Sequence, residues 1–266
     1  MELGKAIRMS RLFNKSGKLL DIALDHGIAY GVLPGIENVS KVIKASVEGG
    51  ADAVTLHKGF ARGIFKDFVG KISLVVKCTS FSAFHPSLDV WVTDVEEAVS
   101  LGADAIAVGV IIGDERQPEM LGNLGLISEK AYRFGMPLIC HIYPKGNLVP
   151  NSERYSVENI SYAARIAAEL GVDIVKTWYT GSPKTFSKVV EAANHAKVVV
   201  AGGPKVDDPI KILQMTKEVM EAGAVGVTYG RNVWQYKNPV RMIKALSLII
   251  HEGKAVEEAK EFLLSE

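Results

Sequence analysis

The segment Leu170-Gly-Val-Asp-Ile-Val175 belongs to a set of four similar stretches, and this repeat decides the fold. The other three are Glu48-Gly-Gly-Ala-Asp-Ala-Val54, Leu101-Gly-Ala-Asp-Ala-Ile106 and Ala222-Gly-Ala-Val-Gly-Val227. In each, a glycine suits the left-handed position just after a helix, and the apolar run that follows suits a strand buried on both faces. The repeat therefore predicts four places where a helix ends and a parallel strand begins.

Short apolar runs alternate along the whole chain with longer stretches in which apolar residues recur three and four positions apart, as in repeated βα units. Eight runs are expected strands: Leu19–Leu24, Ala53–His57, Leu74–Cys78, Ala105–Ile112, Leu138–Tyr143, Asp173–Trp178, Val198–Ala201 and Val225–Tyr229. Eight is the number that a closed barrel needs, and the length of 266 residues is near the ~250 usual for one.

We therefore predict an α/β fold, a (β/α)8 TIM barrel, in which residues 1–266 form a single domain with a short N-terminal extension and a C-terminal helix. No low-complexity tract or Pro/Ser-rich linker divides the chain. An open doubly wound sheet is the alternative, but the Gly-x-Gly-x-x-Gly motif that a dinucleotide-binding fold would place after its first strand is missing.

Composition excludes several classes of partner. With 48% hydrophobic residues, 23% charged residues and a formal charge of +1, the chain has no electrostatic bias toward nucleic acid. The N-terminus lacks the features of a signal peptide, and the longest apolar run, Ala105–Ile112, is too short to cross a membrane. Cys78 and Cys140 lie in apolar runs and indicate buried free thiols in a reducing compartment, so we expect a cytoplasmic protein.

Polar side chains gather where the expected strands end, and in a barrel the active site is built at the C-terminal ends of the strands. Lys176 alternates with Ile174, which predicts that its amine points into the barrel interior. Burial and nearby cations lower the pKa of a lysine toward the range in which the neutral amine attacks a carbonyl. Lys176 is therefore the candidate for a Schiff base, and a lysine that extends to the strand end or pairs with a carboxylate is the alternative.

Lys77, in the third expected strand, is a rival nucleophile. It is also a candidate for the cation that lowers the pKa of Lys176 or binds a substrate hydroxyl, and a structural ion pair with Asp25 is equally compatible with its position.

Three residues at strand ends are candidates for handling protons and hydroxyl groups. Tyr143 ends the fifth strand beside the sixth, where its phenol would transfer the proton when a carbon–carbon bond is cleaved. The alternative is a tyrosine whose ring is packed and whose hydroxyl is hydrated. Asp25 closes the first strand and would bind a substrate hydroxyl or assist dehydration of the carbinolamine, unless it only caps the turn. His26 is expected to contact substrate or to be structural.

Glycines and cations follow the last two strands. Gly202, Gly203 and Gly230 would let the main chain approach an oxyanion, and Arg231 would bind it bidentately with Lys205 adding charge. Barrels commonly bind phosphate at this place, so we predict a phosphate site, with ordinary βα turns as the alternative.

The sequence contains no motif typical of a metal site or of a nucleophilic serine. The six histidines form no His-x-x-x-His or His-x-His pattern, and no Gly-x-Ser-x-Gly is found. Cys140 and His141 are adjacent in a strand, so their side chains point to opposite faces and form no nucleophile–base pair. We expect no metal and no cofactor.

Five segments together resemble the archaeal-type class I fructose-bisphosphate aldolases, from about Arg11 to the C-terminus. They are Leu24-Asp-His-Gly27, Tyr143-Pro-Lys-Gly146, Asp173-Ile-Val-Lys-Thr-Trp-Tyr-Thr-Gly181, Ala201-Gly-Gly-Pro-Lys205 and Gly230-Arg-Asn-Val-Trp-Gln235. The resemblance implies a (β/α)8 barrel in a high-order homo-oligomer and a phosphorylated sugar as substrate.

The same resemblance implies roles for single residues. Lys176 would be the Schiff-base lysine, Tyr143 the proton-transfer residue and Asp25 the acid of the first strand. The glycines and Arg231 would bind the C1 phosphate of the ketose. The expected reaction is cleavage of fructose 1,6-bisphosphate to dihydroxyacetone phosphate and glyceraldehyde 3-phosphate.

Some positions depart from these aldolases. His141 stands where they place tryptophan, and Lys145 where the turn usually has arginine. Leu56-His-Lys-Gly59 is similar to the related aminodideoxyheptulosonate synthases, which implies a transaldol reaction with aspartate semialdehyde as an alternative. A noncovalent phosphosugar isomerase and a sugar-phosphate sensor are alternatives of other classes, because neither requires an imine.

Overall fold

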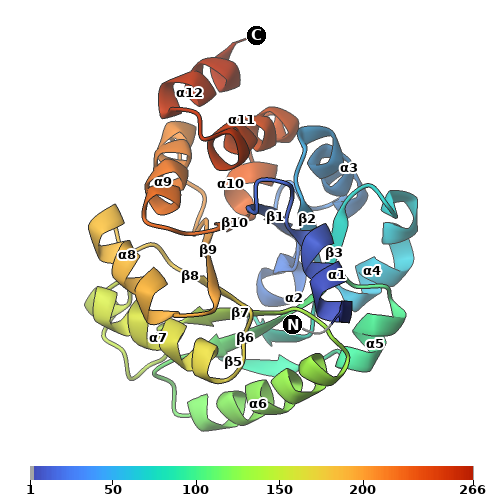
Figure 1. Ribbon diagram of the computed structural model, residues 1–266, viewed down its shortest axis with the longest axis vertical. Helices are drawn as coiled ribbons and strands as arrows, with labels where there is room; N and C mark the ends of the chain where they lie inside the picture. The colour runs from blue at the N-terminus through green and yellow to red at the C-terminus, as the bar shows by residue number, and fades with distance from the viewer. Residues whose placement is uncertain (1–2, 266) are drawn as a thin grey trace.

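The computed structural model describes residues 3–265, and in this range eight parallel strands form a closed barrel (Figure 1). The order around the barrel is β1, β10, β9, β8, β7, β6, β3 and β2. Their bounds are Leu19–Ala23 (β1), Ala53–His57 (β2), Ser73–Lys77 (β3), Ala105–Ile111 (β6), Leu138–Tyr143 (β7), Ile174–Thr177 (β8), Lys197–Ala201 (β9) and Gly226–Tyr229 (β10). The predicted (β/α)8 class is confirmed, and each expected strand is found with its ends shifted by at most one residue.

Eight helices surround the strands in a ring (Figure 1). They are α3 (Val39–Gly49), α4 (Lys58–Ile64), α5 (Val95–Ser100), α6 (Gln117–Arg133), α7 (Val157–Glu169), α8 (Pro183–Ala192), α9 (Pro209–Glu221) and α11 (Pro239–Glu252). Several begin at a capping side chain that accepts a backbone N–H, as Ser156 does at α7 and Asp208 at α9. Within residues 3–265, no helix has the length and apolarity needed to cross a bilayer.

Shorter elements complete the chain. Helix α2 (His26–Tyr30) follows β1, α10 (Arg231–Trp234) follows β10, and α12 (Val256–Leu264) ends the described chain against α9 and α11. Two 3₁₀ turns, η1 (Phe65–Phe68) and η2 (Asn151–Glu153), lie in the connections.

The repeat that predicted the fold has a structural cause. Its glycines at 50, 102, 171 and 223 all have positive φ, as expected after a helix. Its three aspartates each accept a backbone N–H from the neighbouring strand: Asp52 from Leu20 at 2.7 Å, Asp104 from Leu74 at 3.2 Å and Asp173 from Leu138 at 2.9 Å. Each carboxylate thus joins the start of its own strand to the barrel strand that precedes it in the chain. The fourth copy of the repeat has Val225 at this position.

Helix α1 (Leu3–Leu12) covers the end of the barrel at which the strands begin (Figure 1). Leu12 and Phe13 pack with Ile174 and other interior side chains of the strands in one buried cluster. Lys5 Nζ lies 2.9 Å from Asp173 Oδ1 and holds the helix in place. The interior of the barrel is therefore closed at this end by apolar side chains.

A two-stranded antiparallel hairpin was not predicted. It consists of β4 (Thr79–Ser82) and β5 (His85–Trp91), and it is inserted between β3 and α5. Every residue of β5 except Asp89 is exposed or partly exposed, so the hairpin lacks the apolar run by which the barrel strands were identified.

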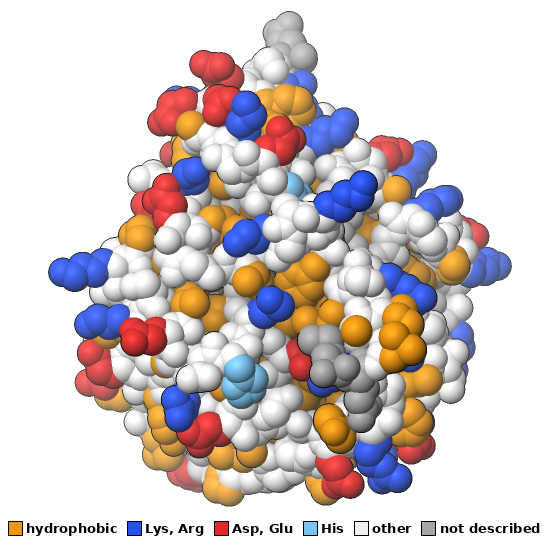
Figure 2. All heavy atoms as spheres, in the orientation of Figure 1, with side chains coloured by type: hydrophobic (Ala, Val, Ile, Leu, Met, Phe, Trp, Pro, Cys, Tyr) orange, Lys and Arg blue, Asp and Glu red, His pale blue; other side chains and the backbone are white. Residues whose placement is uncertain are grey.

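Cys78 and Cys140 are both buried and free, as expected, and burial raises the pKa of each thiol to about 12. On the face in Figure 2, acidic and basic side chains are interspersed rather than gathered by sign, in keeping with the formal charge of +1.

Candidate active site

A pocket opens at the C-terminal ends of the strands, where the sequence predicted the site. It is lined by residues from most sides of the barrel, including Asp25, Lys77, His141, Tyr143 and Lys176. A second hollow adjoins it, shares Lys176 and Tyr143, and extends over the loops that follow β9 and β10.

Lys176 lies in the barrel interior on β8, in register with His141 of β7, and only 6% of it is exposed. Burial lowers the pKa of its amine, Asp25 and Asp21 oppose this effect, and the Lys77 ammonium adds to it. Burial is thus the main cause of the lowered pKa, and the neighbouring cation is a smaller one. Among the residues that the structure describes, Lys176 Nζ forms no hydrogen bond or salt bridge with another side chain.

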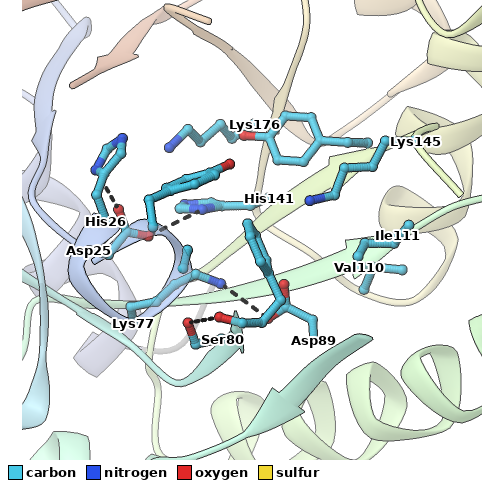
Figure 3. Close-up of a pocket in the computed structure, with 14 residues that line it drawn as sticks. Asp25, His26, Lys77, Ser80, Asp89, Val110, Ile111, His141, Lys145 and Lys176 are labelled. Carbon is cyan, nitrogen blue, oxygen red and sulfur yellow. Dashed lines mark hydrogen bonds and ion pairs between the residues drawn. The ribbon is translucent and has the colours of Figure 1, made fainter. Parts of the chain in front are cut away.

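Asp25 lies between two imidazoles in the pocket (Figure 3): its Oδ1 is 3.7 Å from His26 Nδ1 and its Oδ2 is 3.8 Å from His141 Nδ1. Burial opposes ionisation of Asp25, but the cationic groups around it, Lys176 foremost, hold its pKa below the usual range. Burial also lowers the pKa of His26, to about 4, and that of His141. At neutral pH the group is therefore one carboxylate between two neutral imidazoles.

Tyr143 is the last residue of β7 and lies two positions after His141, on the same side of the strand. Its ring is 4.9 Å from the ring of Trp178, which in turn is stacked on Tyr155 at 4.7 Å. Burial raises the pKa of the Tyr143 phenol well above its usual value, so the hydroxyl is protonated in the free protein. The aromatic neighbours had no predicted role, although Trp178 follows β8 directly.

The predicted phosphate residues lie together. Gly202, Gly203, Gly230 and Arg231 all line the second hollow beside Lys176. Gly203 has a φ of +68°, which favours glycine, and Arg231 donates to its carbonyl oxygen at 3.2 Å.

Lys205 is not among the residues that line this hollow. Its side chain is exposed and lines a separate hollow on the other side of the loop. Asn232, a residue to which the sequence assigned no role, bonds to the same loop. Its Nδ2 donates to the carbonyl oxygens of Gly202 and Pro204, and its Oδ1 accepts from the N–H of Val206. These three bonds hold the loop that carries Lys205.

Lys58, from the segment that resembles the synthases, also lies apart from the pocket. Its Nζ is 3.0 Å from Glu97 Oε2 on α5.

Lys77 has a different carboxylate partner from the one considered for it. Its Nζ lies 3.7 Å from Oδ1 of Asp89, on the hairpin (Figure 3). The same Nζ donates to Thr79 Oγ1 at 3.1 Å. No salt bridge between Lys77 and Asp25 is found in the described part of the chain. Asp89 was missed because it belongs to the unpredicted hairpin; its only signal in the sequence is a carboxylate between Leu88 and Val90.

Asp21 is a second carboxylate that was missed. It lies inside the barrel on β1, 1% exposed, and its Oδ2 accepts a hydrogen bond from Thr55 at 2.7 Å. Burial raises its pKa from 3.8 to about 6, although Lys176 and Thr55 oppose the rise. A charged residue between Leu20 and Ile22 in a strand was the available signal.

We expect Asp21→Asn to stabilise the protein at neutral pH. The folded state holds the Asp21 proton more tightly than the unfolded state, so ionisation costs stability once the pH rises from about 4 through about 6. At about 1.36 kcal/mol per pKa unit the cost above that window is about 2–3 kcal/mol, and asparagine, which can still accept from Thr55, removes it.

Urea unfolding at pH 7.5 and at pH 4.5 measures this effect: the gain should be large at the higher pH and shrink at the lower one. Asp67→Asn, at an exposed position, removes the same charge without burial and should change stability by less than about 0.5 kcal/mol. An Asp21→Asn gain of equal size at both pH values would contradict the assignment.

No group of three or more potential metal-ligating side chains occurs between residues 3 and 265. The pocket and the adjoining hollow present a buried amine, a carboxylate, a phenol and two glycine-containing loops with an arginine.

Comparisons with known proteins match this chain to aldolases. The family model described as DeoC/LacD family aldolase matches residues 19–236. Fructose-bisphosphate aldolase class 1 of Thermoproteus tenax is 35% identical over 255 residues, which cover 93% of this chain and 95% of the relative.

A second relative is 2-amino-3,7-dideoxy-D-threo-hept-6-ulosonate synthase 1 of Archaeoglobus fulgidus, 37% identical over 262 residues, covering 98% of this chain and 96% of its own. One similar solved structure is that of an archaeal fructose-1,6-bisphosphate aldolase whose catalytic lysine is bound to the carbinolamine intermediate of the substrate. It superposes with a TM-score of 0.86 at 33% identity, and the match covers 93% of this chain and 99% of that one.

Proposed function

The chain belongs to the DeoC/LacD family of aldolases, and from this premise we propose that Lys176 forms a Schiff base with a ketose phosphate, fructose 1,6-bisphosphate being the leading substrate. The observation that carries the proposal is the position of Lys176: a buried amine of lowered pKa at the C-terminal end of the barrel, between a phenol and an anion-binding loop pair. Membership of a family of aldolases disfavours the isomerase and the sensor alternatives.

In the proposed reaction the neutral amine of Lys176 attacks the C2 ketone, and loss of water from the carbinolamine gives an iminium ion. The iminium accepts the electron pair of the C3–C4 bond as that bond breaks. At the same time the C4 hydroxyl loses its proton, and carbons C4 to C6 leave as an aldehyde. Protonation of the resulting enamine at C3 and hydrolysis of the imine release dihydroxyacetone phosphate and restore the amine.

Tyr143 handles the proton at the C4 oxygen. In the direction of synthesis the protonated phenol donates to the alkoxide that develops there. In cleavage the same oxygen takes the proton back, and the positive charge of the iminium favours the phenolate that this requires.

Asp25 acts as an acceptor for a substrate hydroxyl. Its carboxylate stays ionised at neutral pH, so it has no proton to donate for dehydration of the carbinolamine. Of the two roles considered for this residue, the ionised state therefore supports hydroxyl binding, with His26 and His141 orienting the carboxylate from either side.

The two phosphates of the substrate find cations on different loops, and one of these cations, Lys145, lines both hollows. Gly202, Gly203, Gly230 and Arg231 would bind the C1 phosphate beside Lys176. Lys145 lines the first pocket, and burial lowers its pKa to about 8, so it is mostly protonated at pH 7 and available to the C6 phosphate.

A coupled dehydrogenase assay for glyceraldehyde 3-phosphate tests the proposal. Fructose 1,6-bisphosphate should give a steady signal, and fructose 6-phosphate, which lacks the C1 phosphate, should give none. The transaldol reaction with aspartate semialdehyde is the second candidate, favoured by the 37% identity with the Archaeoglobus fulgidus synthase. No signal from the bisphosphate at high enzyme concentration would make that reaction the better assignment.

A further inference from the structure

Asp89 is a carboxylate placed in the pocket by an otherwise exposed hairpin. Most of β5 faces solvent, yet Asp89 is only 6% exposed and lines the same pocket as Lys176, His141 and Tyr143. Burying a carboxylate is costly unless the charge is paired and its oxygens accept hydrogen bonds. The burial of Asp89 in this pocket therefore requires an explanation from its neighbours.

Three neighbours accommodate this carboxylate. Gly109 of β6 leaves the space that Asp89 occupies, because a Cβ added to Gly109 would collide with the Asp89 carboxyl group. Thr79 Oγ1 accepts from the Gly109 N–H at 2.6 Å and from Lys77 Nζ at 3.1 Å, which fixes both groups beside Asp89. Side chains and backbone from β3, β4, β5 and β6 thus converge on one place.

The carboxylate still has an open position. Its Oδ1 is buried and has no hydrogen-bond partner among the described residues, and Lys77 approaches it only to 3.7 Å, which is an ion pair without a hydrogen bond. Asp89 lines the pocket, so a substrate bound there lies next to a carboxylate with an unused acceptor. A buried acceptor beside a substrate pocket is suited to a donor brought by the substrate.

The order of the strands says which part of the substrate comes near. From Lys176 on β8, the anion-binding loops follow β9 and β10 in one direction. In the other direction come β7 with Tyr143, β6 with Gly109 and β3 with Lys77. A ketose held by its C1 phosphate and its C2 imine therefore extends its remaining carbons past Tyr143 toward Asp89.

We propose that Asp89 accepts a hydrogen bond from a hydroxyl group on the aldehyde half of the substrate, carbons C4 to C6, and so selects hydroxylated aldehydes. Lys77 pairs with the carboxylate, and Gly109 makes room for it. This inference rests on the proposed function, because it takes the phosphate end and the imine position from it.

The test is synthesis from dihydroxyacetone phosphate with two aldehydes of three carbons, D-glyceraldehyde and propanal, of which only the first carries hydroxyl groups. Asp89→Asn should lower kcat/KM for glyceraldehyde by about 10- to 100-fold, the scale of a hydrogen bond to a charged group, and change that for propanal by less than about 3-fold. Gly109→Ala, which displaces the carboxylate without removing it, should show the same selectivity loss. Ser87→Ala, at an exposed position of the same hairpin, should match the parent.

Borohydride trapping of dihydroxyacetone phosphate separates the outcomes. If the parent traps none, the proposed function fails before Asp89 is tested. Two results would show that the assignment is wrong: Asp89→Asn traps dihydroxyacetone phosphate as the parent does and yet lowers kcat/KM equally for both aldehydes, or it lowers kcat/KM for neither of them. Loss of trapping in Asp89→Asn alone would also overturn it, since the residue would then serve the ketone half.

Discussion

Lys176→Ala should abolish both covalent capture of dihydroxyacetone phosphate and turnover of the bisphosphate. A lysine amine of ordinary pKa, about 10.4, is almost fully protonated at neutral pH and cannot attack a carbonyl. Burial at Lys176 lowers this pKa, and the side chain has no carboxylate in direct contact in the described structure to hold the proton. Removing the amine removes the only group on which the proposed intermediate forms.

Incubation with dihydroxyacetone phosphate, borohydride reduction and peptide mapping should place the adduct on the peptide that contains Lys176. Lys77→Met serves as the matched control, because it removes the other buried lysine of the pocket and should still be labelled at Lys176. An adduct on Lys77 in the parent, or full activity in Lys176→Ala, would refute the mechanism.

Tyr143→Phe should keep imine formation and slow carbon–carbon cleavage by about 100-fold or more, the scale of general acid–base catalysis. Phenylalanine retains the ring that packs on Trp178, so only the hydroxyl is lost. Trapping of dihydroxyacetone phosphate should therefore be unchanged while kcat for the bisphosphate falls.

Steady-state turnover and trapping yield, measured on the same preparation, separate the two steps. Tyr162→Phe, on the exposed face of α7, removes a hydroxyl far from any predicted role and should leave both unchanged. Parent-like turnover in Tyr143→Phe would exclude the phenol from proton transfer.

The strands were predictable because their burial on both faces requires continuous apolar runs, and the glycines between them are fixed by backbone conformation. Lys176, Tyr143 and Asp25 were predictable for the same reason: once a strand is located, its last residues have to lie at the rim. The assembly into a high-order homo-oligomer remains a prediction.

The features that were missed depend on contacts between distant segments. The β4–β5 hairpin has no apolar run, so nothing in its sequence indicated that Asp89 turns inward to Lys77 and Gly109. Lys205 lies only two positions after Gly203 in the sequence, whereas the bonds that Asn232 forms with this loop join residues about 30 positions apart. Asp21 could be predicted only if it was known that its position on the strand faces the barrel interior near Lys176.

The aspartates of the repeat have a consequence for how such a protein can change over evolutionary time. Asp52, Asp104 and Asp173 join neighbouring strands at the end that carries no reactive group. Loops at the opposite rim, including the hairpin that brings Asp89, are not part of these bonds. New substrate preferences can therefore arise by exchange of rim segments while the scaffold that carries them is inherited intact, which also makes this barrel a suitable starting point for laboratory selection of aldolases with other acceptors.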